Sequence, residues 1–153
     1  MNNENLVYSH TAYFNILKTR GMQGLQKNMP LWKFKLSEEE YEALKQTLRC
    51  HTSDLARYGE EAALCYAEWW RRDYRGSIPS KEDVAMGIGL HRRLGDDLYM
   101  AARKALQKHG YAFLHSLKGT EYFRTLLNQG GLPVNYIKNS GNIGYFSKFL
   151  KEL

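Results

Sequence analysis

The chain has 153 residues, a length typical of one domain, and 43% of them are hydrophobic, enough to form a core. Twenty-two lysines and arginines against 16 aspartates and glutamates give a net charge of +6, which suits an acidic partner without requiring one. No apolar run approaches the roughly 18–20 residues that a membrane-spanning helix needs, so we expect no membrane partner.

The cysteines and the N-terminal residues indicate the compartment. Cys50 and Cys65 form no CxxC motif, and each falls in a predicted helix, where a free cysteine usually behaves as a small buried hydrophobic residue. The first residues lack the basic and apolar regions of a signal peptide. Both observations predict a cytoplasmic protein.

The first half of the chain begins with a short helix and continues with a short extended segment. Residues 31–36 alternate between apolar and basic side chains, and this period of two predicts an extended conformation. The apolar side of that segment carries Trp32, Phe34 and Leu36. The next residues, Ser37-Glu38-Glu39-Glu40, have the pattern of a capping box, which predicts a helix running to about residue 50.

The longest predicted helix runs from about Asp54 to Tyr74, where apolar side chains recur at intervals of three and four residues. Trp69 and Trp70 lie near its end. Adjacent side chains on a helix project about 100° apart, so both tryptophans reach the core only if the buried face is broad. We expect Trp69 to be largely buried and Trp70 to lie nearer an arginine rim. The expected outer face carries Arg57, Glu61, Glu68 and Arg72.

The second half reads as a series of shorter helices. Their expected ranges are a short helix after Ser80, 96–109, 111–117, 121–128, 133–138 and 143–153. With no partner for the extended segment, the sequence predicts a single, almost all-α domain of about six to eight helices over residues 1–153. The last predicted helix runs to the final residue, which suggests one module of a longer protein.

The titratable residues form no recognisable catalytic or metal-binding motif. The five histidines include no HxH or HxxxH pair, and the adjacency of Cys50 and His51 does not make a metal site. Most carboxylates are explained by helix starts, or by an i,i+4 ion pair in the case of Glu68 and Arg72. P-loop, GxSxG and HExxH signatures are absent from the sequence. We therefore expect a non-catalytic protein without catalytic residues, metal or cofactor.

Two interpretations of the aromatic and basic residues stay open. In the first, the chain is a helical interaction module that contacts another protein, or another domain of the same system, through Trp32 and Trp70. In the second, it is a sequence-tolerant nucleic-acid-binding domain whose basic second half contacts phosphates. The residues proposed for that contact are Arg71, Arg75, Arg92, Arg93, Arg103, Lys104 and Lys108. Clustered positive charge would favour the second interpretation and scattered charge the first. Neither interpretation predicts an oligomeric state.

Three segments carry a resemblance to known proteins. They are Leu31-Trp32-Lys33-Phe34-Lys35-Leu36-Ser37 followed by Glu40-Tyr41, then Ala67-Glu68-Trp69-Trp70-Arg71-Arg72, and Gly130-Gly131-Leu132-Pro133. They are similar to the N-terminal region of a family of large, poorly characterised bacterial proteins of defence and mobile-element islands. The resemblance covers residues from about 30 to 140 and carries over no catalytic residues. It implies a cytoplasmic bacterial module tied to defence against phage or foreign DNA.

Overall fold

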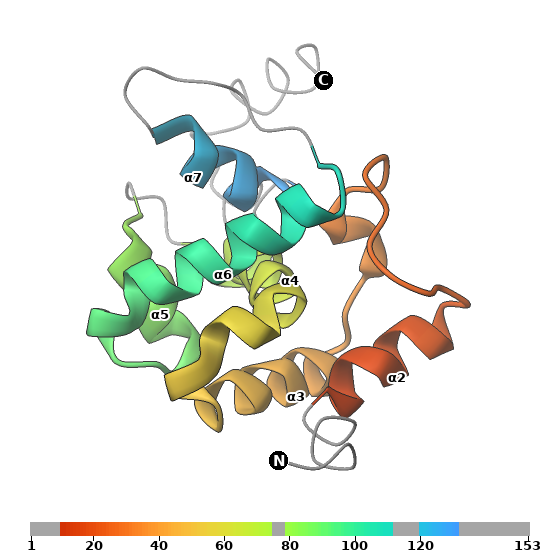
Figure 1. Cartoon of the computed structure of the whole chain (residues 1–153), viewed down its shortest axis with the longest axis horizontal. Coiled ribbons are helices and arrows are strands. Elements are labelled where there is room, and N and C mark those ends of the chain that lie inside the picture. The colour runs from red at the N-terminus through yellow and green to blue at the C-terminus, as the bar shows by residue number, and fades with distance from the viewer. Residues whose placement is uncertain (1–9, 75–78, 112–119, 132–153) are drawn as a thin grey trace, which may run out of the picture.

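The computed structural model describes residues 10–74, 79–111 and 120–131, and within these residues the chain forms helices and turns without a strand (Figure 1). The predicted all-α fold is confirmed. The elements are α2 (Thr11–Thr19), η1 (Leu31–Phe34), α3 (Glu38–Arg49), η2 (Thr52–Tyr58), α4 (Gly59–Asp73), α5 (Lys81–Ile88), η3 (Arg92–Leu94), α6 (Gly95–Lys108) and α7 (Thr120–Asn128), where η marks a 3₁₀ helix. The helices predicted at 111–117, 133–138 and 143–153 lie almost wholly outside the described residues. No helix in the described part is long and apolar enough to cross a membrane.

Helix α4 lies at the centre of this assembly. It packs against α3, α5, α6 and α7, and its most extensive contact is with α6, which crosses it (Figure 1). Residues 59–69 of α4 are all buried except Glu60, so the first three turns are covered on every side. The apolar periodicity therefore identified the central helix correctly.

Trp69 is 7% exposed, which confirms its predicted burial. Its indole lies against Gly87 of α5, where an added Cβ would collide with the ring. A side chain at position 87 would push α5 away from α4, so the glycine permits the close approach of these two helices.

Local sequence signals set the beginning of two helices. At the start of α3 the Glu40 N–H donates to Ser37 Oγ at 3.1 Å, and the Ser37 N–H donates to Glu40 Oε1 at 2.9 Å. This is the capping box that the sequence predicted. Ser80 and Asp83 form a second one at the start of α5.

The prediction of an extended segment at residues 31–36 is wrong. Leu31–Phe34 is a 3₁₀ helix, and Lys35 follows it in the left-handed conformation with φ of 50°. Because residues three apart share a face of a 3₁₀ helix, Leu31 and Phe34 point together into the core, each 1% exposed. Trp32 points outward instead of sharing a side with Phe34.

Two features of the predicted long helix also need correction. Its first part is the separate 3₁₀ helix η2, and Asp54 inside it has non-helical backbone angles, so α4 begins at Gly59. Glu61 and Glu68 lie in the interior, 0% and 2% exposed, and not on an outer face. Both carboxylates are tolerated there because each receives a hydrogen bond from a basic side chain. Cys65 is buried as expected, whereas Cys50 is exposed.

Candidate functional site

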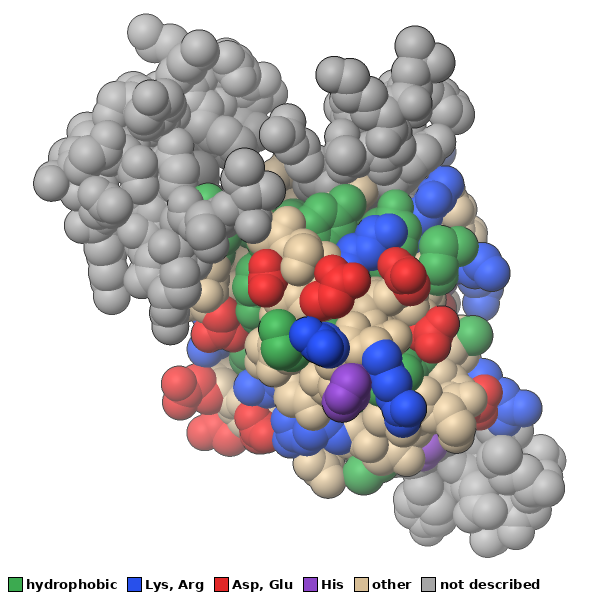
Figure 2. Space-filling view, turned by 90° about the vertical axis from the view of Figure 1, so that its left-hand side faces the viewer, with side chains coloured by type: hydrophobic (Ala, Val, Ile, Leu, Met, Phe, Trp, Pro, Cys, Tyr) green, Lys and Arg blue, Asp and Glu red, His purple; other side chains and the backbone are tan. Residues whose placement is uncertain are grey.

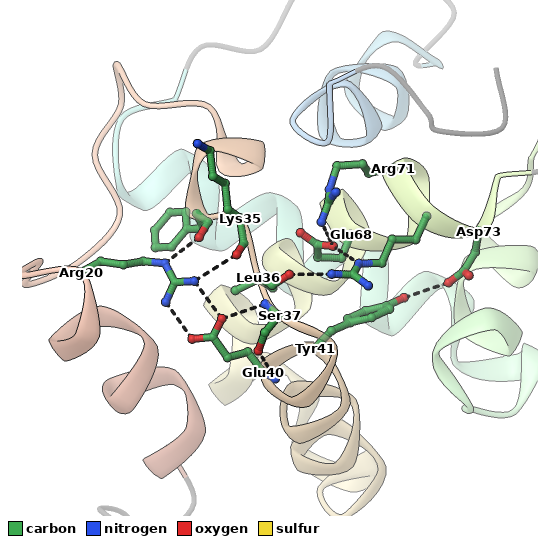
Figure 3. Close-up of polar contacts among 11 residues, drawn as sticks. Arg20, Lys35, Leu36, Ser37, Glu40, Tyr41, Glu68, Arg71 and Asp73 are labelled. Carbon is green, nitrogen blue, oxygen red and sulfur yellow. Dashed lines mark hydrogen bonds and ion pairs between the residues drawn. The ribbon is translucent and has the colours of Figure 1, made fainter. Parts of the chain in front are cut away.

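The 3₁₀ helix η1 and the residues that follow it are held in place by two arginines from other elements (Figure 3). Arg20, just after α2, donates from Nε to the Phe34 carbonyl at 2.6 Å and from Nη2 to the Lys35 carbonyl at 3.2 Å. Arg72, near the end of α4, donates from Nη2 to the Leu36 carbonyl at 2.5 Å. The backbone carbonyls of three consecutive residues at the end of η1, Phe34, Lys35 and Leu36, therefore each accept a hydrogen bond from an arginine side chain.

Each of these arginines is fixed in turn by a carboxylate. Glu40 receives two hydrogen bonds from Arg20, at 2.7 and 2.8 Å, a bidentate geometry. The pairing with Arg20 holds the pKa of Glu40 below its ordinary value. The buried Glu68 carboxylate accepts from Arg71 Nη2 and Arg72 Nε through one oxygen, both at 2.6 Å.

The other end of η1 is held by the turn that follows α7. The Trp32 N–H donates to the Gln129 carbonyl at 2.8 Å, and the Leu31 N–H donates to the Gln129 side chain at 3.2 Å. Gly131, with φ of 75°, lies so close to Trp32 that an added Cβ would sit 3.2 Å from the indole. Segments about one hundred positions apart in the sequence are thereby joined.

Trp70 contacts the same glycine turn from α4. Its indole nitrogen donates to the Gly131 carbonyl at 2.8 Å, and its ring contacts that of Tyr74 in a tilted arrangement with centroids 4.3 Å apart. A Cβ on Gly130 would collide with the Ala67 carbonyl and lie 3.1 Å from the Trp70 ring. The structure therefore brings Trp32 and Trp70 to one turn, with Trp70 half-buried as part of its packing.

These contacts leave an exposed aromatic side chain close in sequence to two exposed lysines. Trp32 is 39% exposed, and the Lys33 Nζ lies 5.8 Å from the centroid of its ring. Lys33 and Lys35 are both exposed. We call Trp32, Lys33 and Lys35 the Trp32 surface. Phe14, Met86 and Met100 are also exposed, but each lies alone on a different helix.

Comparison with protein families identifies the domain. A family model described as the YjiT N-terminal domain matches residues 4–132. The chain belongs to this family. The match agrees with the expected N-terminal region of larger proteins, and it contains Gln129 and the glycine turn that hold η1. No curated protein and no solved structure matches the chain.

The basic residues predicted to bind nucleic acid lie in separate places in this member of the YjiT N-terminal domain family. Arg71 faces Glu68 near the end of α4, and Arg75 lies outside the described residues. Arg92 and Arg93 are exposed on η3, before the start of α6. The remaining three lie in the last two turns of α6, on the order of 15–20 Å further along that helix. They are Arg103, Lys104 and Lys108.

The charge around these residues is mixed. Figure 2, which shows the side of the molecule on which α5 lies, has Lys and Arg side chains interspersed with Asp and Glu. Lys81 of α5 pairs with Asp96 of α6 at 3.4 Å, and Glu60 receives a hydrogen bond of 3.0 Å from His109 beside Lys108. Acidic side chains therefore lie among the basic ones on the side that Figure 2 shows.

A second buried carboxylate, Glu61, accepts a 2.7 Å hydrogen bond from His10 Nδ1. Burial raises the pKa of Glu61, and the bond to His10 lowers it in part. Its other oxygen, Oε1, has no hydrogen-bond partner among the described residues. Tyr58 lies between the rings of His10 and His51, at 4.6 and 4.4 Å. Within the described residues no three histidine, cysteine or acidic side chains converge as metal ligands would.

Sequence reasoning missed the arginine frame around η1. Nothing local marks Arg20 as the partner of Glu40, because the two residues belong to different helices. The burial of Glu61 was easier to predict from the sequence, since Glu61 lies three residues after Tyr58 and four before Cys65, on the same helix face as these apolar residues.

Proposed function

We propose that this domain is a non-catalytic interaction module of a larger bacterial protein and that the Trp32 surface is its contact site. The partner is another protein, or another domain of the same system. The setting in the cytoplasm, in a system directed against phage or associated with mobile elements, belongs to the proposal and rests on the resemblance of the three segments quoted above.

The observation that carries the proposal is the way Trp32 is presented. Tryptophan is one of the residues enriched at the energetically dominant centres of interfaces. Here the backbone of Trp32 is tied to Gln129 and the following carbonyls are tied to Arg20 and Arg72. A segment whose backbone is fixed in this way loses little backbone conformational entropy when a partner binds.

The chemistry of the interior supports the same proposal. The two buried carboxylates are engaged by basic side chains that join α4 to neighbouring segments, His10 for Glu61 and Arg72 for Glu68. The scattered positive charge of the second half favours an interaction module over a phosphate-binding face.

The experiment is a binding titration between this chain and the remainder of its larger protein, produced separately. We expect Trp32→Ala to weaken the association by about 30-fold or more, as truncation of an aromatic residue at an interface centre does. Phe14→Ala, which removes an exposed aromatic side chain from α2, is the matched control and leaves the affinity unchanged. Association that is insensitive to Trp32→Ala would contradict the proposed site.

A further inference from the structure

We propose that the Trp32 surface binds single-stranded nucleic acid, with Trp32 stacking on a base and the two lysines contacting phosphates. This inference goes beyond the proposed function, because it assigns a second class of partner to the same surface. It also moves nucleic-acid binding from the second half of the chain to residues 32–35.

The 3₁₀ conformation of η1 is what puts the aromatic ring of Trp32 beside the Lys33 ammonium. In an extended segment Trp32 would lie on one side and both lysines on the other. In the structure all three side chains are exposed, and the Lys33 ammonium lies 5.8 Å from the Trp32 ring centroid. A flat ring beside cations is the arrangement with which proteins bind single strands without regard to sequence.

The charge of the Trp32 surface itself favours an anionic ligand, and the exposed Glu38 and Glu39 lie beyond it in the first turn of α3. The two carboxylates that belong to the frame around η1 are neutralised, Glu40 by Arg20 and Glu68 by Arg71 and Arg72. Lys33 and Lys35 take part in no ion pair within the described residues, so their charges are available to a ligand. The net charge of +6 over the chain adds a long-range attraction for a polyanion.

The same features distinguish a nucleic acid from an acidic peptide. Both would pair with the lysines, but every base also offers a flat face that can stack on the indole, a contact that peptide carboxylates lack. A double helix keeps its bases stacked on one another, so it offers Trp32 no such face. The geometry therefore favours single strands.

The test is a fluorescence anisotropy titration of the whole chain with oligothymidylate and oligoadenylate of about ten nucleotides, and with a duplex, at about 50 and 200 mM salt. We expect both single strands to bind more tightly than the duplex, and binding to weaken as salt is raised. Trp32→Ala should weaken binding by about ten-fold or more, and Trp32→Phe, which keeps an aromatic face, should restore most of it. Replacing Lys33 and Lys35 together by Gln should lower the slope of log affinity against log salt by about 1.4.

Arg92→Gln with Arg93→Gln is the matched control, since it removes two exposed cations from η3. If this control reduces the salt slope as much as the change of Lys33 and Lys35 does, the inference is overturned. Absence of binding at low salt, or preference for the duplex, overturns it as well. If Trp32-dependent association with the remainder of the larger protein persists in that case, the proposed function stands and only the inference of nucleic-acid binding is wrong. Urea unfolding of each variant confirms that losses of binding are not losses of folding.

Discussion

Arg72 and Glu68 lie one turn apart on α4, and Arg72 joins the buried Glu68 carboxylate to the Leu36 carbonyl through two nitrogens, Nε and Nη2, of one guanidinium group. The bond to Glu68 measures 2.6 Å and the bond to Leu36 measures 2.5 Å. The central helix is in this way linked to the segment that presents Trp32. A substitution in the core near Glu68 should therefore also affect the conformation of the Trp32 surface.

Glu68→Ala should lower the free energy of unfolding by about 3 kcal/mol, because it leaves two arginines without the buried carboxylate that orients them. Glu42→Ala is the control, since it removes an exposed carboxylate that pairs with Lys45 and Arg49, and it should cost clearly less because exposed ion pairs are screened by solvent. Urea denaturation measures both. Equal costs for the two variants would show that the Glu68 cluster has no special role.

Trp69→Ala and Trp70→Ala should differ in their effect on stability. Trp69 is enclosed between α4 and α5, so its truncation should cost about 3–5 kcal/mol. Trp70 is half-buried and makes one hydrogen bond to Gly131, so its truncation should cost less. The measurement is chemical denaturation of the two variants in parallel. A larger cost at position 70 would contradict the described packing.

Gly130→Ala should destabilise the domain by about 1–3 kcal/mol, because the new Cβ would collide with the Ala67 carbonyl and press on Trp70. Gly24→Ala is the matched control, since its nearest neighbour would be a His109 atom at 3.9 Å, an ordinary contact. Thermal unfolding of both variants checks the difference. Full stability of the Gly130 variant would mean that the turn after α7 does not pack on α4 as described.

The stability of the domain should depend on pH through Glu61. Burial raises the pKa of Glu61 above its ordinary value, Glu60 adds to the increase, and His10 opposes it. Folding therefore favours the protonated carboxyl, so this contribution is complete below the unfolded pKa and is lost as pH rises through the folded pKa. Glu61→Gln removes the titration. We expect the free energy of unfolding of the native chain, relative to that variant, to fall as pH is raised from about 4 to 8, and a constant difference would refute this.

The sequence was sufficient for the features that depend on local patterns. The capping box at Ser37 and the burial of Trp69 follow from three- and four-residue spacings, and both are confirmed. The segment at residues 31–36 was misjudged, because the alternation of apolar and basic residues fits an extended strand as well as a 3₁₀ turn. In the structure the 3₁₀ turn is stabilised by hydrogen bonds from Leu31 and Trp32 to Gln129, which lies far along the chain.

The candidate site could be predicted only in part from the sequence, for a related reason. Trp32 was a candidate for a partner surface from its residue type, but its exposure depends on Arg20 and Arg72, which reach η1 from two other helices. Pairings between distant elements leave no periodic signal in a single sequence. The proposed basic residues of the second half were grouped by their position in the sequence, but they are separated in space. Arg92 lies on η3 before α6, and Lys108 is at the far end of α6.

The most direct test of the account is fluorine NMR of the chain with its three tryptophans replaced by fluorotryptophan, each resonance being assigned by substitution to Phe. The resonance of Trp32 should respond to solvent in the free chain, and that of Trp69 should not, in line with their 39% and 7% exposure. On addition of oligothymidylate or of the remainder of the larger protein, the Trp32 resonance should shift while the Trp69 resonance stays in place. A Trp32 resonance that is unmoved by a bound partner would contradict the claim that this surface is the contact site.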